Sequence, residues 1–114
     1  MVTVKHVTFD ALDPAKLAQF WSKVTGQPVE NDWGGFVVLK SSADWPALAF
    51  YKTDQPKTVK DRIHLDLKVE NLDSETKRLT ALGAKLLSEH ESEHLTWYVM
   101  ADLEGNEFCL SSQW

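Results

Sequence analysis

The chain has almost no cysteine and no long apolar run, and both absences narrow what it can be. Cys109 is the only cysteine among 114 residues, which excludes an intrachain disulfide and a metal site of clustered thiolates. No apolar run approaches the ~20 residues of a membrane-spanning helix, and the first residues lack the basic-then-apolar order of a secretion signal. We therefore expect a cytoplasmic protein whose metal ligands, if it has any, are histidines and carboxylates.

An excess of basic residues is also missing. The chain has 12 Lys and Arg against 17 Asp and Glu, giving a net charge of −5, and its basic residues are scattered rather than gathered in a stripe. This distribution argues against nucleic acid or an anionic membrane as a partner. A small-molecule ligand is the partner that we expect.

An internal repeat is the most informative feature that is present. An alternating segment starting at His6 precedes a helical pattern that begins at Asp13 and stops at Gly26. A second alternating segment, starting at His64, precedes a helical pattern that runs from Asn71 and stops at Gly83. The two halves are offset by about 58 positions.

Three strand candidates follow each helical pattern, so each half reads as βαβββ. They are 27–31, 36–40 and 47–53 in the first half, and 84–89, 96–101 and 107–111 in the second. We predict an α+β fold in which the two repeats form a curled mixed sheet around a cup, with the helices on the outer face. Residues 1–114 are expected to form a single domain, with repeat 1 at about 1–54, a linker at about 55–61 and repeat 2 at about 62–114.

Strand alternation places two histidines in matching positions on the face away from the helices. Val7 and Phe9 point one way and His6 the other, while Leu65 and Leu67 likewise oppose His64. In the last strand, Phe108 and Leu110 belong to the core face, which leaves Glu107 and Cys109 opposite. If the sheet curls, His6, His64 and Glu107 can converge in the cup.

Further side chains are expected to line the cup and to give it a polar and an apolar side. Aligning Pro46 with Gly105 puts Leu48 at the place of Glu107, and Phe50 shares the face of Leu48. The rings of Trp33 and Trp97 lie in or beside the middle strands, where they could stack on a planar ligand or serve in packing. The predicted cup residues besides the histidines and Glu107 are thus Leu48, Phe50, Trp33, Trp97, Asp66 and Cys109.

Three segments carry a resemblance to a known superfamily. They are His6-Val-Thr-Phe-Asp before Asp13-Pro14, Arg62-Ile-His-Leu-Asp-Leu-Lys-Val, and Asp102-Leu-Glu-Gly-Asn-Glu-Phe-Cys-Leu. With them the chain resembles the vicinal oxygen chelate superfamily of glyoxalase I, extradiol dioxygenases and bleomycin-resistance proteins, and most of all its small glyoxalase-like proteins. The resemblance covers essentially the whole chain and implies a homodimer.

The resemblance also implies where a metal ion would bind. In this superfamily the ligands come from the first and last strands of each repeat, which correspond here to His6, Leu48, His64 and Glu107. Leu48 cannot be a ligand, so the implied set is two histidines and one carboxylate for one divalent ion of Fe, Mn, Ni or Zn.

Two functions remain open at this stage. The first is a metal-dependent enzyme of the dioxygenase or isomerase/lyase type, in which no residue is assigned as the catalytic acid or base because Glu107 serves as a ligand. The second is a metal-free protein that binds or sequesters a ligand, as resistance proteins of the superfamily do, and performs no catalysis.

Overall fold

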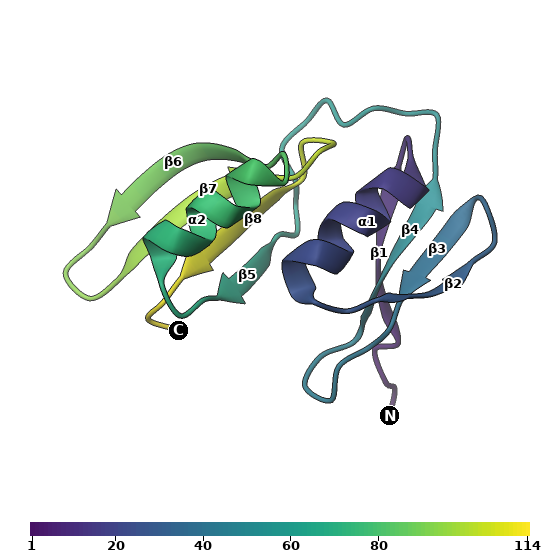
Figure 1. Ribbon diagram of the computed structural model, residues 1–114, viewed down its shortest axis with the longest axis horizontal. Coiled ribbons are helices and arrows are strands. Elements are labelled where there is room, and N and C mark those ends of the chain that lie inside the picture. The colour runs from purple at the N-terminus through teal and green to yellow at the C-terminus, as the bar shows by residue number, and fades with distance from the viewer. The chain divides into compact units, whose positions relative to one another are not determined.

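Two βαβββ repeats follow one another along the chain in the computed structural model, which describes residues 1–114 (Figure 1). They form two compact units, Met1–Pro56 and Lys57–Trp114, and their boundary falls within the predicted linker. The predicted α+β class and the two repeats are confirmed. None of the helices has the length and apolar character needed to cross a membrane.

The first unit consists of one helix and a four-stranded sheet. Its elements are β1 (His6–Ala11), α1 (Pro14–Thr25), β2 (Val29–Asp32), β3 (Phe36–Leu39) and β4 (Ala47–Lys52). The strand order is β1-β4-β3-β2, with β1 and β4 parallel and the other pairs antiparallel. The first and last strands of the repeat are therefore neighbours in its sheet.

Helix α1 begins and ends at the residues that the sequence predicts. The side chain of Asp13 accepts a hydrogen bond from the amide of Lys16, Pro14 follows as the first helical residue, and Gly26 ends the helix with a φ of 76°. The inner face of the helix buries Leu17, Phe20 and Trp21 against the sheet. This aromatic packing fixes which face of the first sheet is covered.

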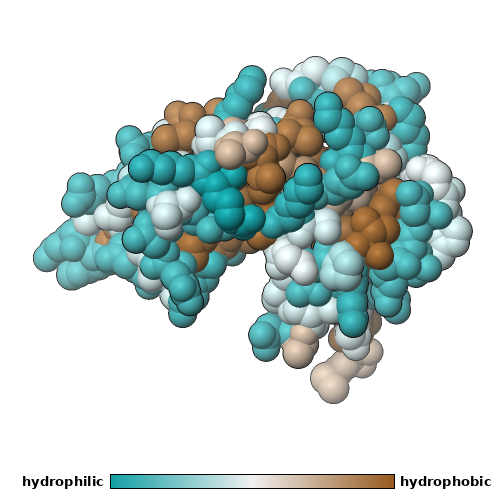
Figure 2. Space-filling model, in the orientation of Figure 1, coloured by the Kyte–Doolittle hydropathy of each residue, from teal (hydrophilic) through white to brown (hydrophobic).

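The second unit repeats the same order of elements. It contains β5 (Leu65–Lys68), α2 (Leu72–Ala81), β6 (Lys85–Glu91), β7 (Thr96–Ala101) and β8 (Glu107–Ser111), with the strand order β5-β8-β7-β6. Strands β5 and β8 are parallel, and β6, β7 and β8 pair antiparallel. The β6–β7 hairpin ends in a hydrophilic tip (Figure 2).

Helix α2 is attached to its sheet less deeply than α1. Asn71 caps it by accepting a hydrogen bond from the amide of Ser74, but the helix buries only Thr76 and Leu79. The hydroxyl of Tyr98 on β7 adds a polar link by donating to Asp73, at 3.1 Å. After the helix, Gly83 has a φ of 110° and leaves no room for a Cβ, which would lie 2.6 Å from Leu103.

Candidate functional site

The face of each sheet that lies away from its helix, called here the helix-free face, carries the candidate site residues. In the second unit, Tyr98 marks the helix side because it contacts α2, and its partner Leu110 on β8 shares that side. Cys109, the neighbour of Leu110, therefore belongs to the helix-free face. Cys109 is paired with Asp66 on the parallel strand β5, which places both side chains on this face.

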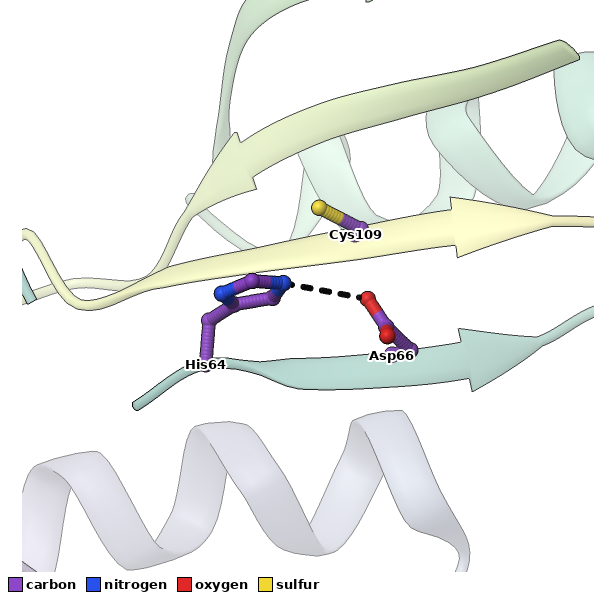
Figure 3. A group of neighbouring side chains, drawn as sticks. All are labelled: His64, Asp66 and Cys109. Atoms are coloured by element: carbon purple, nitrogen blue, oxygen red, sulfur yellow. Dashed lines mark ion pairs between the residues drawn. The ribbon is translucent and has the colours of Figure 1, made fainter. Parts of the chain in front are cut away.

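His64, Asp66 and Cys109 come together on this helix-free face. The Nε2 atom of His64 lies 3.3 Å from Oδ1 of Asp66, and one ligand atom from each of the three residues lies within 4.8 Å of the other two. Figure 3 shows the imidazole at the residue just before β5, the carboxylate on β5 and the thiol on the adjacent strand β8. Cys109 is 8% exposed, whereas the other two side chains are about half exposed.

The thiol of Cys109 stays protonated around neutral pH because of its surroundings. Burial raises its pKa above the ordinary value of 9.0, and the negative charge of Asp66 and Glu107 acts in the same direction. A neutral, buried thiol is a poor nucleophile. The protonated thiol of Cys109 therefore does not suit covalent catalysis. It can bind a metal ion once it has lost its proton.

Glu107 stands beside His64 but outside this group of three. Leu65 and Phe108 are the first paired residues of the parallel strands β5 and β8. The residues directly before them, His64 and Glu107, are therefore also neighbours. The amide of Glu107 donates to Oδ2 of Asp61, at 2.6 Å. Glu107 takes part in none of the ion pairs of the structure.

The turn before β8 holds Glu107 in place through Asp102, a residue that the sequence analysis did not single out. The carboxylate of Asp102 is buried and accepts hydrogen bonds from the amides of Glu104 and Asn106 and from the Asn106 side chain. The segment Asp102-Leu-Glu-Gly-Asn contains the Asp, Gly and Asn residues that favour such a turn. It could have been found in the sequence as a positioning element for the last strand.

The predicted placement of Leu48 and Phe50 in the cup is wrong. Val7 pairs with Leu48 and Phe9 with Phe50 on the parallel strands β1 and β4, and the ring of Phe9 lies 5.5 Å from that of Trp21 in α1. Leu48 and Phe50 therefore lie under the helix, where they are 3% and 0% exposed. The alignment of Pro46 with Gly105 was one residue out of register, and a slip of one residue moves a strand side chain to the other face.

Ala47 is the residue that lies opposite His6 on the helix-free face of the first unit. Like Leu48, it has no atom that can bind a metal ion. Val38 and Ala49 are buried in the same cluster as Ala47, with Phe36 packed against it. A pocket of about 440 Å³ opens beside His6 and Ala47 and is also lined by the loop from Ser41 to Pro46.

Aromatic rings extend the helix-free face of the first unit. Trp33 is 65% exposed and stacks on Phe36, with ring centroids 5.9 Å apart and an angle of 10° between the planes. The ring of Phe36 also meets the edges of His6 and Tyr51. This cluster offers a flat, partly exposed surface on which a planar ligand can stack.

Trp97 lies on the helix-free face of the second unit, on the β7 strand next to Cys109. Val99 pairs with Cys109, and Trp97 is two residues earlier on the same face. Its ring stacks on His90, with centroids 4.9 Å apart, and the hydroxyl of Ser88 lies 2.7 Å from Nε2 of that histidine. One side of the Trp97 ring is thus already occupied by packing within the hairpin.

The predicted metal ligands are distributed over the two units. His6 belongs to the first unit, whereas His64 and Glu107 are neighbours within the second. Imidazole nitrogen and carboxylate oxygen suit Fe, Mn, Ni and Zn, so the donor set of the second unit fits a divalent ion.

Comparison with known proteins identifies similar chains. The glyoxalase-like domain family matches residues 6–111. A glyoxalase/bleomycin resistance/dioxygenase family enzyme from Burkholderia phytofirmans is 17% identical, with a TM-score of 0.77 over 96% of this chain and 98% of that chain. No curated protein sequence matches.

Two further similar structures belong to proteins of named function. The fosfomycin resistance protein FosX from Listeria monocytogenes, complexed with Mn(II) and a dihydroxypropylphosphonic acid, is 16% identical, with a TM-score of 0.80 over 100% of this chain and 92% of that chain. Lactoylglutathione lyase from Agrobacterium tumefaciens is 15% identical, with a TM-score of 0.68 over 96% and 92%. At such low identity, these similarities show a shared fold.

Proposed function

This chain belongs to the glyoxalase-like domain family, and from that premise we propose that it binds a small molecule with the help of one divalent metal ion held by His6, His64 and Glu107. The reaction would be of the dioxygenase or isomerase/lyase type. The substrate would present two adjacent oxygens to the metal ion.

The position of His64 beside Glu107 is the observation that supports this proposal. The two residues precede the paired residues Leu65 and Phe108 on adjacent parallel strands, which brings an imidazole and a carboxylate to neighbouring positions. A divalent ion bound there supplies Lewis-acid polarisation of substrate oxygens. Asp61 and Asp102 fix the backbone from which Glu107 projects, so they act as positioning residues.

Ala47 explains why we expect three protein ligands for the metal ion. Its place opposite His6 is equivalent to that of Glu107 opposite His64, and a methyl group donates nothing to a metal ion. Three protein ligands leave coordination positions open for a chelating substrate. FosX, which was solved with Mn(II), and the lyase from Agrobacterium support a role of this kind through their shared fold.

Metal analysis of protein purified without an affinity tag tests the proposal. We expect stoichiometric Fe, Mn, Ni or Zn in the wild-type chain and its loss in His6→Ala, His64→Ala and Glu107→Ala. His94→Ala and Glu93→Ala are matched controls, because both side chains are 87% exposed, and they should keep the metal. A wild-type protein that is metal-free and takes up no added metal would contradict the proposal.

A metal-free binding role is the second candidate, and the stacked pair Trp33–Phe36 favours it. Trp33 exposes most of its surface although it is flat against Phe36, so its outer side is available to a planar ligand. Binding of the planar dye anilinonaphthalene sulfonate to metal-free protein should weaken in Trp33→Ala and remain in Trp114→Ala, whose side chain is also exposed. Equal binding by the two variants would contradict this role.

A further inference from the structure

We propose that His64, Asp66 and Cys109 form a metal site of their own, which takes a thiol-seeking divalent ion such as zinc. This site goes beyond the proposed function, because it needs neither His6 nor Glu107. His64 is a ligand in both sets, so the two sites are alternatives for that imidazole. All three residues belong to the second unit.

Strand geometry brings the three side chains together. Asp66 and Cys109 are paired residues of the parallel strands β5 and β8, and His64 is two residues before Asp66, so all three lie on one face. The two strands are held by the register of four consecutive residue pairs. Asp66 and Cys109 therefore project from paired sheet backbone, and His64 projects from the residue directly before β5.

The distances suit a tetrahedral ion after small side-chain rotations. Bonds of about 2.0–2.3 Å from zinc to nitrogen, oxygen and sulfur place its ligand atoms about 3–4 Å apart. Nε2 of His64 and Oδ1 of Asp66 are already 3.3 Å apart, and all three ligand atoms lie within 4.8 Å of one another. Figure 3 shows the imidazole and the carboxylate facing one another next to β8, the strand that carries the thiol.

The chemistry of the donors points to zinc. Imidazole, carboxylate and thiolate are the three ligand types that zinc uses in proteins, and a three-residue set leaves one position for water. Binding exchanges the thiol proton of Cys109 for the metal ion, and the proton passes to the solvent.

The His64–Asp66 contact alone has little value as a structural ion pair. Both side chains are about half exposed, at 52% and 55%, and exposed ion pairs contribute little to stability because water screens them. A surface contact between His64 and Asp66 also does not require the buried thiol of Cys109 beside it. As metal ligands, the three residues have one common role.

Cobalt(II) is the probe that tests this site, because a cobalt–thiolate bond gives a near-ultraviolet charge-transfer band. We expect the full-length chain to develop this band on titration with Co²⁺ and to lose it when excess Zn²⁺ is added. Cys109→Ser should abolish the band. Asp66→Asn should weaken Co²⁺ binding by about 100-fold or more. This is beyond the ~10–100-fold loss that is typical when a residue only hydrogen-bonds to a metal ligand. His6→Ala and Glu107→Gln should keep the band.

The outcomes separate this site from the set in the proposed function. Full retention of the purified metal in Glu107→Gln contradicts only the proposed function, because the site described here does not include Glu107. Absence of the band in the wild-type chain, or its survival in Asp66→Asn with unchanged affinity, overturns the site described here.

Alkylation of Cys109 provides a second measurement that does not depend on the folding of a Cys109 variant. Zn²⁺ should slow alkylation of the wild-type thiol and have no such effect in Asp66→Asn, with circular dichroism confirming that the variant is folded. Equal protection of both proteins by Zn²⁺ would overturn the site.

Discussion

The helix-free faces of the two repeats differ although their strands follow the same order. The first presents His6 among alanines and aromatic rings, with Ala47 as its paired residue. The second presents His64 beside Glu107, Asp66 and Cys109. One repeat thus presents an apolar surface and the other a set of polar side chains, although the two share one order of strands.

The helix sides of the two repeats differ in the same sense. Helix α1 is held by aromatic packing. The ring centroid of Phe9 lies 5.5 Å from that of Trp21 and 5.2 Å from that of Phe50. Helix α2 buries fewer side chains and uses the hydrogen bond between Tyr98 and Asp73. We expect the first repeat to depend on apolar packing and the second to depend more on polar contacts.

The largest effect should come from Phe50→Ala, which removes a fully buried ring beneath α1. Loss of a buried phenylalanine costs about 3–5 kcal/mol of unfolding free energy. Tyr51→Ala is the matched control, because Tyr51 is the next residue on β4, faces the other way and is 56% exposed. Its cost should be below about 1 kcal/mol. Urea denaturation measures both, and equal costs would contradict the assignment of the two faces.

A smaller loss should follow from Asp102→Ala in the turn before β8. This change leaves the amides of Glu104 and Asn106 without their acceptor in a part-buried turn, at a cost of about 1–3 kcal/mol. Asp54→Ala, at an exposed position, should change the unfolding free energy by less than about 0.5 kcal/mol. Metal retention should also fall in Asp102→Ala, because Glu107 loses its support. Unchanged stability by urea denaturation would show that the turn does not depend on Asp102.

The smallest effect concerns the polar attachment of α2. The carboxylate of Glu89, followed by that of Asp73, raises the pKa of Tyr98 from 10.0 to about 12. Folding therefore strengthens proton binding, so this contribution to stability is complete below pH 10 and is lost as the pH rises through about 12. Ultraviolet titration of Tyr51→Phe, which leaves Tyr98 as the only tyrosine, measures this pKa directly.

The variant Asp73→Asn provides the control for that titration. Added to Tyr51→Phe, it should lower the midpoint of Tyr98, because one of the two carboxylates that raise the pKa loses its charge. An identical midpoint with and without Asp73 would show that α2 is not coupled to β7 through this hydrogen bond.

Local signals predicted the elements of the fold well. Asp13, Pro14 and Gly26 set the limits of α1, Asn71 begins α2, and the strands 96–101 and 107–111 have the predicted bounds. These signals act within a few residues, so the sequence shows them directly. Alternation likewise assigned Glu107 and Cys109 to the same face.

Register was the part that the sequence could not settle. Strand β4 begins directly after Pro46, whereas Asn106 separates Gly105 from β8, and this one-residue difference moved Leu48 and Phe50 to the wrong face. The meeting of His64 and Asp66 with Cys109 depends on the pairing of β5 with β8, which is a contact between distant segments. Such pairing is decided by packing across the sheet, and no local pattern encodes it.

The small side chain of Ala47 has a consequence for what the first repeat can accept. It forms part of the wall of the pocket beside His6, and its methyl group occupies little of that space. Ala47 is also buried against Val38 and Ala49, so a bulkier residue would have to extend into this pocket or disturb their packing. The open space of this pocket thus depends in part on the small volume of one side chain on β4.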